Sequence, residues 1–411
     1  MRRHTHWLVV ALCLLALVAG PTAVAAKPAP PTRTSRDYAL NASDAYEAMQ
    51  GYFYAGNGLY RETAPAQPGQ NPYAYHWPFS QATAATLDLR GIAASYQPAV
   101  ADPQVDAGHY WDATATPPGY DSYVRPPDGQ GGDKYYDDNA WTGLNLVRAY
   151  RLGDGTDAAA LARAREVFAF AVSGWDAALP CAPGGVRWTQ GTFSRDRNTV
   201  STAPNAILAL RLYQIGAQQG WPDADGYLRW AVRMYNWVDT NLRDPVDGLY
   251  WDHVGVDDAA GGAVCTIERT KWSYNQGTMI GAGVLLAQVL NDPAYLRSAE
   301  RTARAALAHY AATARGYFSQ DPAFNAIYFR NLLLLAAATS DPALKGDATQ
   351  PGAIRAALAG YADAVWEDQR IHQRTNLFFF QPGYARLVDQ GALVELNACL
   401  AWDPSRYDLL V

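Results

Sequence analysis

The sequence predicts an all-α protein whose fold is an (α/α)6 barrel, a closed ring of six helical hairpins. Helical periodicity recurs through most of the 411 residues, turn signals separate the periodic segments, and strand-like stretches are few and short. The long loops precede every second helix, which favours a closed ring with one functional face over an open helical solenoid.

The first residues have the features of a secretory signal peptide. Arg2 and Arg3 precede an apolar run over Leu8–Ala19, which is too short to span a bilayer, and the small residues Ala23 and Ala25 mark a cleavage site. We therefore expect a secreted protein with no transmembrane segment after cleavage. The expected parts are a signal peptide over 1–25, a Pro-rich linker over 26–35 and a single barrel domain over 36–411.

Eleven segments carry strong helical patterns, many with apolar residues at i, i+3, i+4 and i+7. They cover residues 36–54, 79–97, 136–152, 157–175, 200–217, 223–241, 274–290, 293–312, 321–338, 352–371 and 385–401. A weaker pattern over 105–112 makes twelve helices, or six hairpins. The strand-like stretches 249–253 and 377–380 are expected to form hairpins in loops. Gly277 and Gly281, one turn apart, are expected to allow close packing of helices.

The composition argues against a nucleic-acid partner. Without Arg2 and Arg3, 31 basic residues face 39 acidic ones, and the formal charge becomes −8. No basic patch stands out, whereas binding of nucleic acid requires one. An aromatic content of 12% beside only 18% charged residues suits a neutral ligand with apolar faces, such as a sugar ring, and it equally suits a large core.

The cysteines and histidines predict no metal centre. Cys181 and Cys265 both lie in Gly-rich loop sequence, so we expect them to form a disulfide in a secreted protein. Cys399 falls in a helical pattern and is expected to be a buried free thiol. The histidines are scattered without paired spacing, so we predict no catalytic metal and no cofactor. The protein is expected to be a monomer.

Two adjacent carboxylates start one of the predicted helices, in the segment GGDKYYDDNAW. Asp137 and Asp138 fall in the first turn, where unpaired N–H groups and the helix dipole favour carboxylates. Capping alone explains many such pairs. Here Tyr135 and Tyr136 precede the pair and Trp141 follows it, an aromatic setting that can hold a sugar.

The chemistry that such a pair favours is glycoside hydrolysis. Repulsion between adjacent carboxylates raises the pKa of one of them, so that a carboxylic acid stands beside a carboxylate, as glycoside hydrolysis requires. Neighbouring Cα atoms lie about 3.8 Å apart, and side chains that splay from them can place the carboxyls about 5–5.5 Å apart, the separation in retaining enzymes. The residues predict a pair and leave open which member is the nucleophile.

The chain resembles glycoside hydrolase family 76, the endo-α-1,6-mannanases. Besides YYDDNAW, the resemblance lies in blocks that come in the family's order over roughly residues 40–400. These blocks are Gly184–Trp188, Arg197-Asn198 with Asn205-Ala206, Trp272–Gly277 and Asn325–Arg330. The resemblance implies a polysaccharide or oligosaccharide substrate and a retaining mechanism, with Asp137 as nucleophile and Asp138 as general acid/base. Arg197 stands where the family usually has lysine.

Further side chains are candidates for binding the sugar, namely Tyr136, Trp141, Trp188, Asn198, Asp252, Tyr274, Asn275 and Gln276. The amides begin helices and either hydrogen-bond sugar hydroxyls or cap the helices. The aromatic rings either stack on sugar faces or belong to the core. Asp252 either binds hydroxyls, supports the pair or is a surface residue. Arg187 and Arg197 favour an acidic or phosphorylated sugar, since guanidinium groups pair with anions.

Several functions remain compatible with these residues. The leading one is internal cleavage of α-1,6-linked mannan or a related cell-wall glycan. A transglycosylase would use the same site and pass the covalent intermediate to a sugar. A glycan-binding barrel without catalysis would not need Asp137. A sugar epimerase on the same class of barrel is disfavoured, because that chemistry commonly uses histidines and this sequence has none in pairs.

Overall fold

A computed structural model of the chain describes residues 33–92, 107–179, 181–257, 264–313, 315–339, 350–371 and 375–411. The predicted signal peptide lies outside the described residues, as does most of the predicted linker. The last linker residues belong to the fold, because the Thr34 hydroxyl accepts a hydrogen bond from the Asp37 N–H at the start of the first helix, and Arg33 Nη1 pairs with Asp363 Oδ1 at 2.6 Å. The compact unit spans Arg33–Val411.

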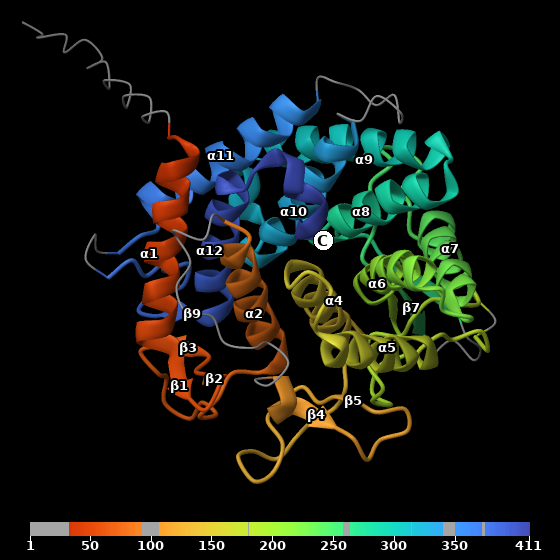
Figure 1. Cartoon of the computed structure of the whole chain (residues 1–411), viewed down its shortest axis with the longest axis horizontal. Helices are drawn as coiled ribbons and strands as arrows, with labels where there is room; N and C mark the ends of the chain where they lie inside the picture. The colour runs from red at the N-terminus through yellow and green to blue at the C-terminus, as the bar shows by residue number, and fades with distance from the viewer. Residues whose placement is uncertain are drawn as a thin grey trace, which may run out of the picture. The chain divides into compact units, whose positions relative to one another are not determined.

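Six helices form the inner ring of a barrel (Figure 1). They are α2 (His76–Arg90), α4 (Tyr136–Leu152), α6 (Thr199–Gln219), α8 (Ser273–Leu290), α10 (Pro322–Thr339) and α12 (Leu387–Ala401). Each packs against the next in this order, and α12 packs against α2, so the ring closes. The prediction of a closed helical barrel rather than an open solenoid is confirmed.

A second layer of helices lies outside the ring (Figure 1). The described members are α1 (Ser35–Phe53), α5 (Ala158–Ser173), α7 (Ala224–Asn241), α9 (Pro293–Ala312) and α11 (Gln350–Asp368). α5 packs on α4, α7 on α6, α9 on α8 and α11 on α10, while α1 packs on α12. Inner and outer helices therefore alternate from α4 to α12, whereas no outer helix is described between α2 and α4.

Burial distinguishes the two layers. Helix α8 buries every residue from Ser273 to Ala287, whereas α7 buries a stripe that includes Ala231, Met234 and Val238. A helix that is apolar on all sides suits the centre of a protein, and an amphipathic helix suits its outside. The run Leu332–Leu335 is fully buried, as an inner-ring position requires.

Two glycines bring α8 and α10 close together. A Cβ on Gly277 would lie 2.6 Å from Tyr328 Cα, and a Cβ on Gly281 would lie 1.9 Å from Asn331 Oδ1. Only glycine leaves room for the facing helix at this distance. The expectation that these glycines serve helix packing is confirmed.

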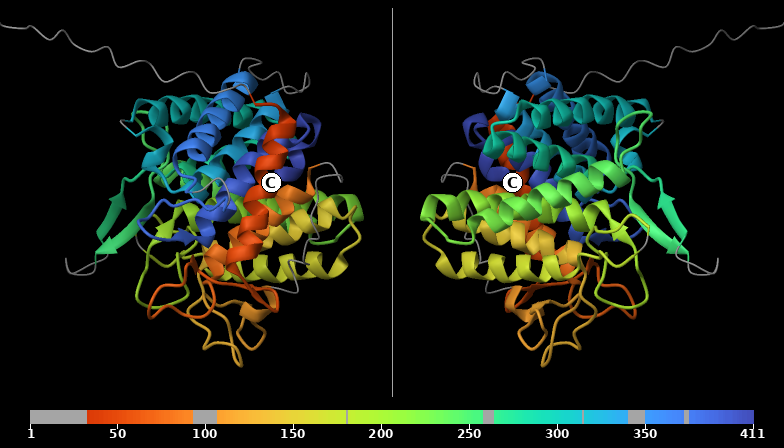
Figure 2. Two further views of the ribbon diagram at one scale, coloured as in Figure 1. Left: turned by 90° about the vertical axis from the view of Figure 1, so that its left-hand side faces the viewer. Right: turned by 90° about the vertical axis from the view of Figure 1, so that its right-hand side faces the viewer.

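The strands are short and lie in the segments that precede inner helices. They are β1 (Tyr54–Gly56), β2 (Leu59–Tyr60), β3 (Thr63–Ala64), β4 (Trp111–Asp112), β5 (Gly119–Tyr120), β6 (Arg197–Asn198), β7 (His253–Asp257), β8 (Val264–Glu268) and β9 (Ala385–Arg386). All pairings are antiparallel: β1 with β2, β3 with β9, β4 with β5, and β6–β7–β8 as one sheet. The β7–β8 hairpin projects from the helices (Figure 2).

Three local predictions differ from the structure. The weak helix over 105–112 is, in its described part, a 3-10 turn over Gly108–Tyr110 followed by β4, because Trp111 and Asp112 pair with β5 rather than with their own neighbours in sequence. Of the stretch 249–253 only His253 belongs to a strand, and in 377–380 Phe378 forms a single bridge with Arg370. Helix α2 ends at Arg90 instead of continuing toward 97.

The predicted disulfide is present. Cys181 and Cys265 are bonded with their Cα atoms 5.7 Å apart, and the bond ties the loop before α6 to β8. Cys399 is a buried free thiol, as predicted. Within the described residues, no helix combines the length and the apolar character that a membrane span needs.

Candidate active site

The start of α4 is fixed by its neighbours rather than by a side-chain cap. Tyr135 is the N-cap residue and has extended backbone angles, but its side chain makes no capping hydrogen bond. The Tyr136 N–H donates to the Trp188 carbonyl at 2.9 Å, so the loop that contains Trp188 lies against the helix start. The buried Asn139 amide donates to the Tyr120 carbonyl at 3.0 Å and accepts from the Tyr120 N–H at 2.7 Å. The backbone that carries Asp137 and Asp138 is therefore held from two sides.

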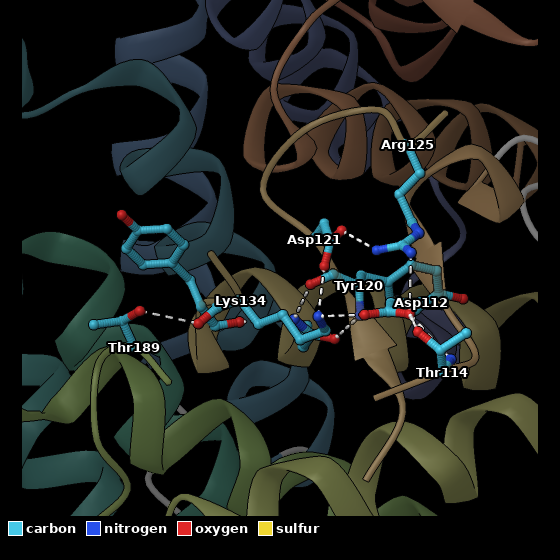
Figure 3. A network of polar contacts seen from close by, with 9 residues as sticks. Asp112, Thr114, Tyr120, Asp121, Arg125, Lys134 and Thr189 are labelled. Carbon is cyan, nitrogen blue, oxygen red and sulfur yellow. Dashed lines mark hydrogen bonds and ion pairs between the residues drawn. The ribbon is translucent and has the colours of Figure 1, made fainter. Parts of the chain in front are cut away.

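A buried ion network holds the loop that leads into α4 (Figure 3). Lys134 Nζ lies 2.9 Å from Asp112 Oδ2 and 2.6 Å from Asp121 Oδ1, and Arg125 pairs with both aspartates. Burial raises the pKa of Asp112, but hydrogen bonds from Thr114 and Lys134 outweigh it and keep the pKa well below its usual range. These contacts fix Lys134 three residues before the carboxylate pair.

The two carboxylates have unequal partners. Asp137 Oδ1 accepts a hydrogen bond from the Asp138 N–H at 3.0 Å, and Asp137 Oδ2 accepts one from Trp188 Nε1 at 3.2 Å. No group among the described residues donates a hydrogen bond to the Asp138 side chain. Donors stabilise the ionised form of a carboxyl, so Asp137 is the better carboxylate of the two.

Both carboxyl groups hold protons more tightly than an exposed aspartate does. Burial raises the pKa of Asp137 and the nearby Asp252 carboxylate raises it further, while the hydrogen bonds from Asp138 N–H and Trp188 act in the opposite direction. Burial and the adjacent Asp137 raise the pKa of Asp138 well above its usual range. The first proton to leave the pair is thus expected to leave from Asp137, with Asp138 remaining a carboxylic acid.

The pair opens into a cavity of about 390 Å³. Its lining consists of Tyr75, Trp77, Ser122, Tyr135, Asp137, Asp138, Trp141, Trp188, Tyr274 and Phe324. Tyr274 and Phe324 stack in parallel with ring centroids 4.0 Å apart, and Trp77 and Trp141 lie 5.8 Å apart. The cavity therefore combines two carboxyls with a mainly aromatic wall, which suits the apolar faces of a sugar.

The lining residues come from the same end of the inner helices. Trp77, Asp137, Tyr274 and Phe324 all fall in the first turn of an inner helix, on α2, α4, α8 and α10 respectively. The helix starts meet at one face of the barrel, the face that also carries the long loops. The sequence-based expectation of one functional face agrees with this arrangement.

Asp252 contacts two polar side chains next to the cavity-lining residue Tyr274 and the loop before α8. Its Oδ2 is 3.0 Å from His253 Nδ1, and its Oδ1 accepts a hydrogen bond from Asn275 Nδ2 at 3.4 Å. Burial lowers the pKa of His253, but the Asp252 and Asp196 carboxylates outweigh burial and raise it overall. Asp252 does not line the cavity, yet its charge acts on Asp137.

The predicted amide residues occupy different surroundings. Asn198 is the N-cap residue of α6, but its side chain does not cap the helix, and its Oδ1 is buried without a partner among the described residues. Asn275 Oδ1 is likewise buried and unpaired in the described part of the chain. Gln276 is different, because its amide accepts from the Tyr250 N–H at 2.7 Å and donates to the Tyr250 carbonyl at 2.8 Å. Gln276 therefore pins the loop before α8 and has no atom left for a ligand.

Tyr136, Arg187 and Arg197 are not among the residues that line the cavity. Tyr136 stacks on Phe170 with centroids 4.5 Å apart and lies in the barrel wall, away from the cavity. Arg187 donates twice to Asp176 Oδ2, at 2.8 and 2.6 Å. Arg197 is buried and donates to the carbonyls of the disulfide loop, at 2.6 Å to Ala182. Arg187 pairs with Asp176 at the surface and Arg197 is buried, so neither guanidinium group is placed to bind an anionic sugar in the cavity.

Four lining residues were missed by the sequence reasoning, namely Tyr75, Trp77, Ser122 and Phe324. Trp77 lies outside the predicted helix, because the prediction starts at residue 79 and α2 starts three residues earlier, at His76. Phe324 stood inside a predicted helix, next to the block that begins at Asn325. Trp77 and Phe324 could have been predicted as site residues, because both are aromatic and fall in the first turn of an inner helix.

Comparison with known proteins gives a family match over most of the chain. The sequence model described as "Glycosyl hydrolase family 76" matches residues 38–377. A curated relative, the mannan endo-1,6-alpha-mannosidase of Candida glabrata, is 31% identical over 110 residues, which are 25% of this chain and 22% of that protein. The alignment with this relative thus covers less than a quarter of its length.

Solved structures share the fold. A family 76 glycoside hydrolase from a bovine Bacteroides thetaiotaomicron strain gives a TM-score of 0.71 at 23% identity, covering 90% of this chain and 79% of that chain. A family 76 mannosidase from Bacteroides thetaiotaomicron VPI-5482 gives 0.71 at 22%, covering 89% and 98%. An inactive variant of an alpha-1,6-mannanase from Salegentibacter sp. HEL1_6, with two adjacent aspartates replaced and alpha-1,6-mannotetrose bound, gives 0.70 at 22%, covering 89% and 99%.

Proposed function

The chain belongs to glycosyl hydrolase family 76, and on that premise we propose that it is a secreted, retaining glycosidase that cleaves α-1,6-linked mannan at internal bonds. The observation that carries the proposal is the pair of adjacent carboxyls with unequal partners in an aromatic cavity. One carboxyl is stabilised as a carboxylate and the other as an acid, which is the division that glycoside hydrolysis needs.

Asp137 is the proposed nucleophile and Asp138 the proposed general acid/base. The hydrogen bonds to Asp137 favour its ionised form and aim it from the start of α4. The absence of donors to Asp138 within the described residues, together with the neighbouring negative charge, favours its protonated form. Catalysis requires these protonation states when the substrate binds, because the nucleophile must be ionised and the general acid must carry a proton.

The reaction then runs in two steps. Asp138 gives its proton to the glycosidic oxygen while an Asp137 oxygen attacks the anomeric carbon, so that the bond to the leaving sugar breaks and a glycosyl ester forms on Asp137. Asp138, now ionised, takes a proton from a water molecule, which attacks the same carbon and releases Asp137 as a carboxylate. Two inversions at one carbon retain its configuration.

Three observations support a neutral mannan as the substrate. The wall of the cavity is mainly aromatic, and the guanidinium groups of Arg187 and Arg197 are occupied by internal partners. The curated relative is named for endo-1,6 cleavage of mannan. The mannanase of the same fold holds an α-1,6-linked oligosaccharide in a variant that lacks two adjacent aspartates.

Secretion is supported by the disulfide between Cys181 and Cys265, because disulfides persist in oxidising compartments. The proposed signal peptide over 1–25 and the proposed single barrel domain over 36–411 follow from the sequence. N-terminal sequencing of the protein from the culture medium should begin at Ala26. Recovery of the protein only inside the cell would contradict secretion.

The activity is tested by incubating the purified protein with α-1,6-mannan and separating the released oligosaccharides. Asp137→Asn and Asp138→Asn should each lower the rate at least about a hundredfold. Asp225→Asn, which makes the same change in the first turn of the outer helix α7, should leave the rate unchanged. No release by wild type from any α-1,6-mannan would overturn the substrate, and full activity of either variant of the pair would overturn the site.

A further inference from the structure

One large apolar side chain lies exposed just outside the cavity. Phe193 is 61% exposed and sits in the loop between Trp188 and β6. A single exposed apolar residue is ordinary on a protein surface and needs no explanation by itself. Phe193 differs because the surrounding loop holds its ring in one place and because its ring contacts two aromatic residues of the cavity wall.

The ring is held over a glycine. A Cβ on Gly191 would lie 2.5 Å from Phe193 Cε1 and 2.9 Å from Phe193 Cδ1, so no other residue at 191 leaves the ring where it is. The Gly191 N–H donates to Thr189 Oγ1 at 3.0 Å, which fixes the backbone below the ring. The position of Phe193 therefore depends on the packing of its own loop.

Both ends of the loop are anchored next to the catalytic segment. The Gln190 N–H donates to the Lys134 carbonyl at 2.9 Å, and the Trp188 N–H donates to the Asp196 carbonyl at 2.9 Å. Ser194 Oγ donates to Asp196 Oδ2 at 2.8 Å within the loop. A fixed aromatic face loses little conformational freedom when a ligand stacks on it, which favours binding.

The Phe193 ring continues the aromatic wall of the cavity. Its centroid lies 6.4 Å from those of Tyr135 and Trp188, both of which line the cavity. The planes of Phe193 and Trp188 meet at 86°, so one sugar ring cannot lie flat on both. A sugar on Phe193 must then be a different unit of the chain from a sugar on Trp188, the residue that bonds to Asp137.

We propose that Phe193 is a stacking platform for a mannan unit outside the cavity, and that it sets a preference for long chains. This inference rests on the proposed function. Substrates long enough to reach Phe193 gain its contact, and shorter ones do not. The contact lies away from the reacting bond, so its effect falls on KM for long substrates rather than on kcat.

The test compares wild type, Phe193→Ala and Phe193→Trp on α-1,6-manno-oligosaccharides of increasing length and on the polymer. Phe193→Ala should lower kcat/KM for the polymer roughly tenfold through KM and leave it unchanged for the shortest cleaved substrate. Phe193→Trp should keep the preference for length, because it keeps an aromatic face. Val246→Ala, which truncates a side chain that is 91% exposed on another loop, is the control and should change nothing.

Gly191→Ala gives an independent check, because it displaces the ring without removing it. It should reproduce the selective loss of Phe193→Ala on the polymer at an unchanged melting temperature. An equal loss of kcat/KM on substrates of all lengths, or no loss on the polymer, would overturn the proposed role of Phe193 and leave the proposed function intact. Failure of wild type to cleave any α-1,6-mannan would overturn both.

Discussion

Two neighbouring aspartates acquire different properties from their surroundings. Asp137 receives hydrogen bonds from a backbone N–H and from the Trp188 indole, whereas Asp138 receives none from the described residues. Burial raises the pKa of both carboxyls. The hydrogen-bond donors lower the pKa of Asp137 only, and the neighbouring Asp137 raises the pKa of Asp138 further. The roles in catalysis follow from this asymmetry.

The pH profile should respond in opposite directions to two substitutions. Asp137 must be ionised to attack, so kcat/KM falls as the pH drops through its pKa. Trp188→Phe removes a donor that lowers this pKa, and the acidic limb should move to higher pH. Asp252→Asn removes a negative charge that raises the pKa of Asp137, so the acidic limb of the pH profile should move to lower pH. Shifts in the same direction for both variants would contradict this account.

At the residue scale the sequence predicts chemistry better than geometry. The aspartate pair, Trp141, Trp188 and Tyr274 could be singled out because their types and spacing suit a sugar site, and all of them line the cavity. Gln276 looks the same in sequence, but its amide is used by the loop at Tyr250. Such non-local partners are invisible in the sequence.

The elements that carry the site are positioned by loops. Asp112, Asp121 and Arg125 surround Lys134 and hold the segment before α4 (Figure 3), while the loop at Trp188 holds it from the other side. Most helix ends could be predicted because turn residues and periodicity are local signals, although both ends of α2 were misplaced. Strand β4 could not be predicted in this way, because its pairing with β5 depends on residues further along the chain.

Lys134→Met should destabilise the protein by about 3 kcal/mol, because it removes the buried cation between Asp112 and Asp121 and leaves them only the more exposed Arg125. Urea unfolding of the variant measures the change. Adding Asp112→Asn should recover part of the loss, since Arg125 then has one aspartate to neutralise instead of two. A midpoint equal to that of wild type in Lys134→Met would show that the network does not stabilise the loop.

The contact between α8 and α10 can be tested by comparing the same substitution, glycine to alanine, at two helix positions. Gly277→Ala places a Cβ 2.6 Å from the backbone of Tyr328 and should cost about 1–3 kcal/mol of stability. Gly360→Ala in α11 meets no atom within 4 Å and should stabilise by roughly 0.5–1 kcal/mol. Thermal melting of both variants checks the pair, and a stabilised Gly277→Ala would refute the close packing.

At the scale of the whole molecule, the closed ring gathers residues that are far apart in sequence. The first turns of α2, α4, α8 and α10 contribute to one cavity because every inner helix starts at the same face. The helical repeat and the placement of the long loops made the ring predictable. Which helix starts meet around the carboxyl pair depends on how the ring closes, and no local pattern in the sequence encodes it.

In the proposed mechanism, Asp137 and Asp138 cleave mannan by two displacements at one carbon. The most direct measurement follows the cleavage of an α-1,6-manno-oligosaccharide by proton NMR and identifies the anomer that appears first. The new reducing end should form as the α-anomer and only later equilibrate with the β-anomer. First appearance of the β-anomer would mean a single displacement by water, and would contradict the assignment of Asp137 as the nucleophile.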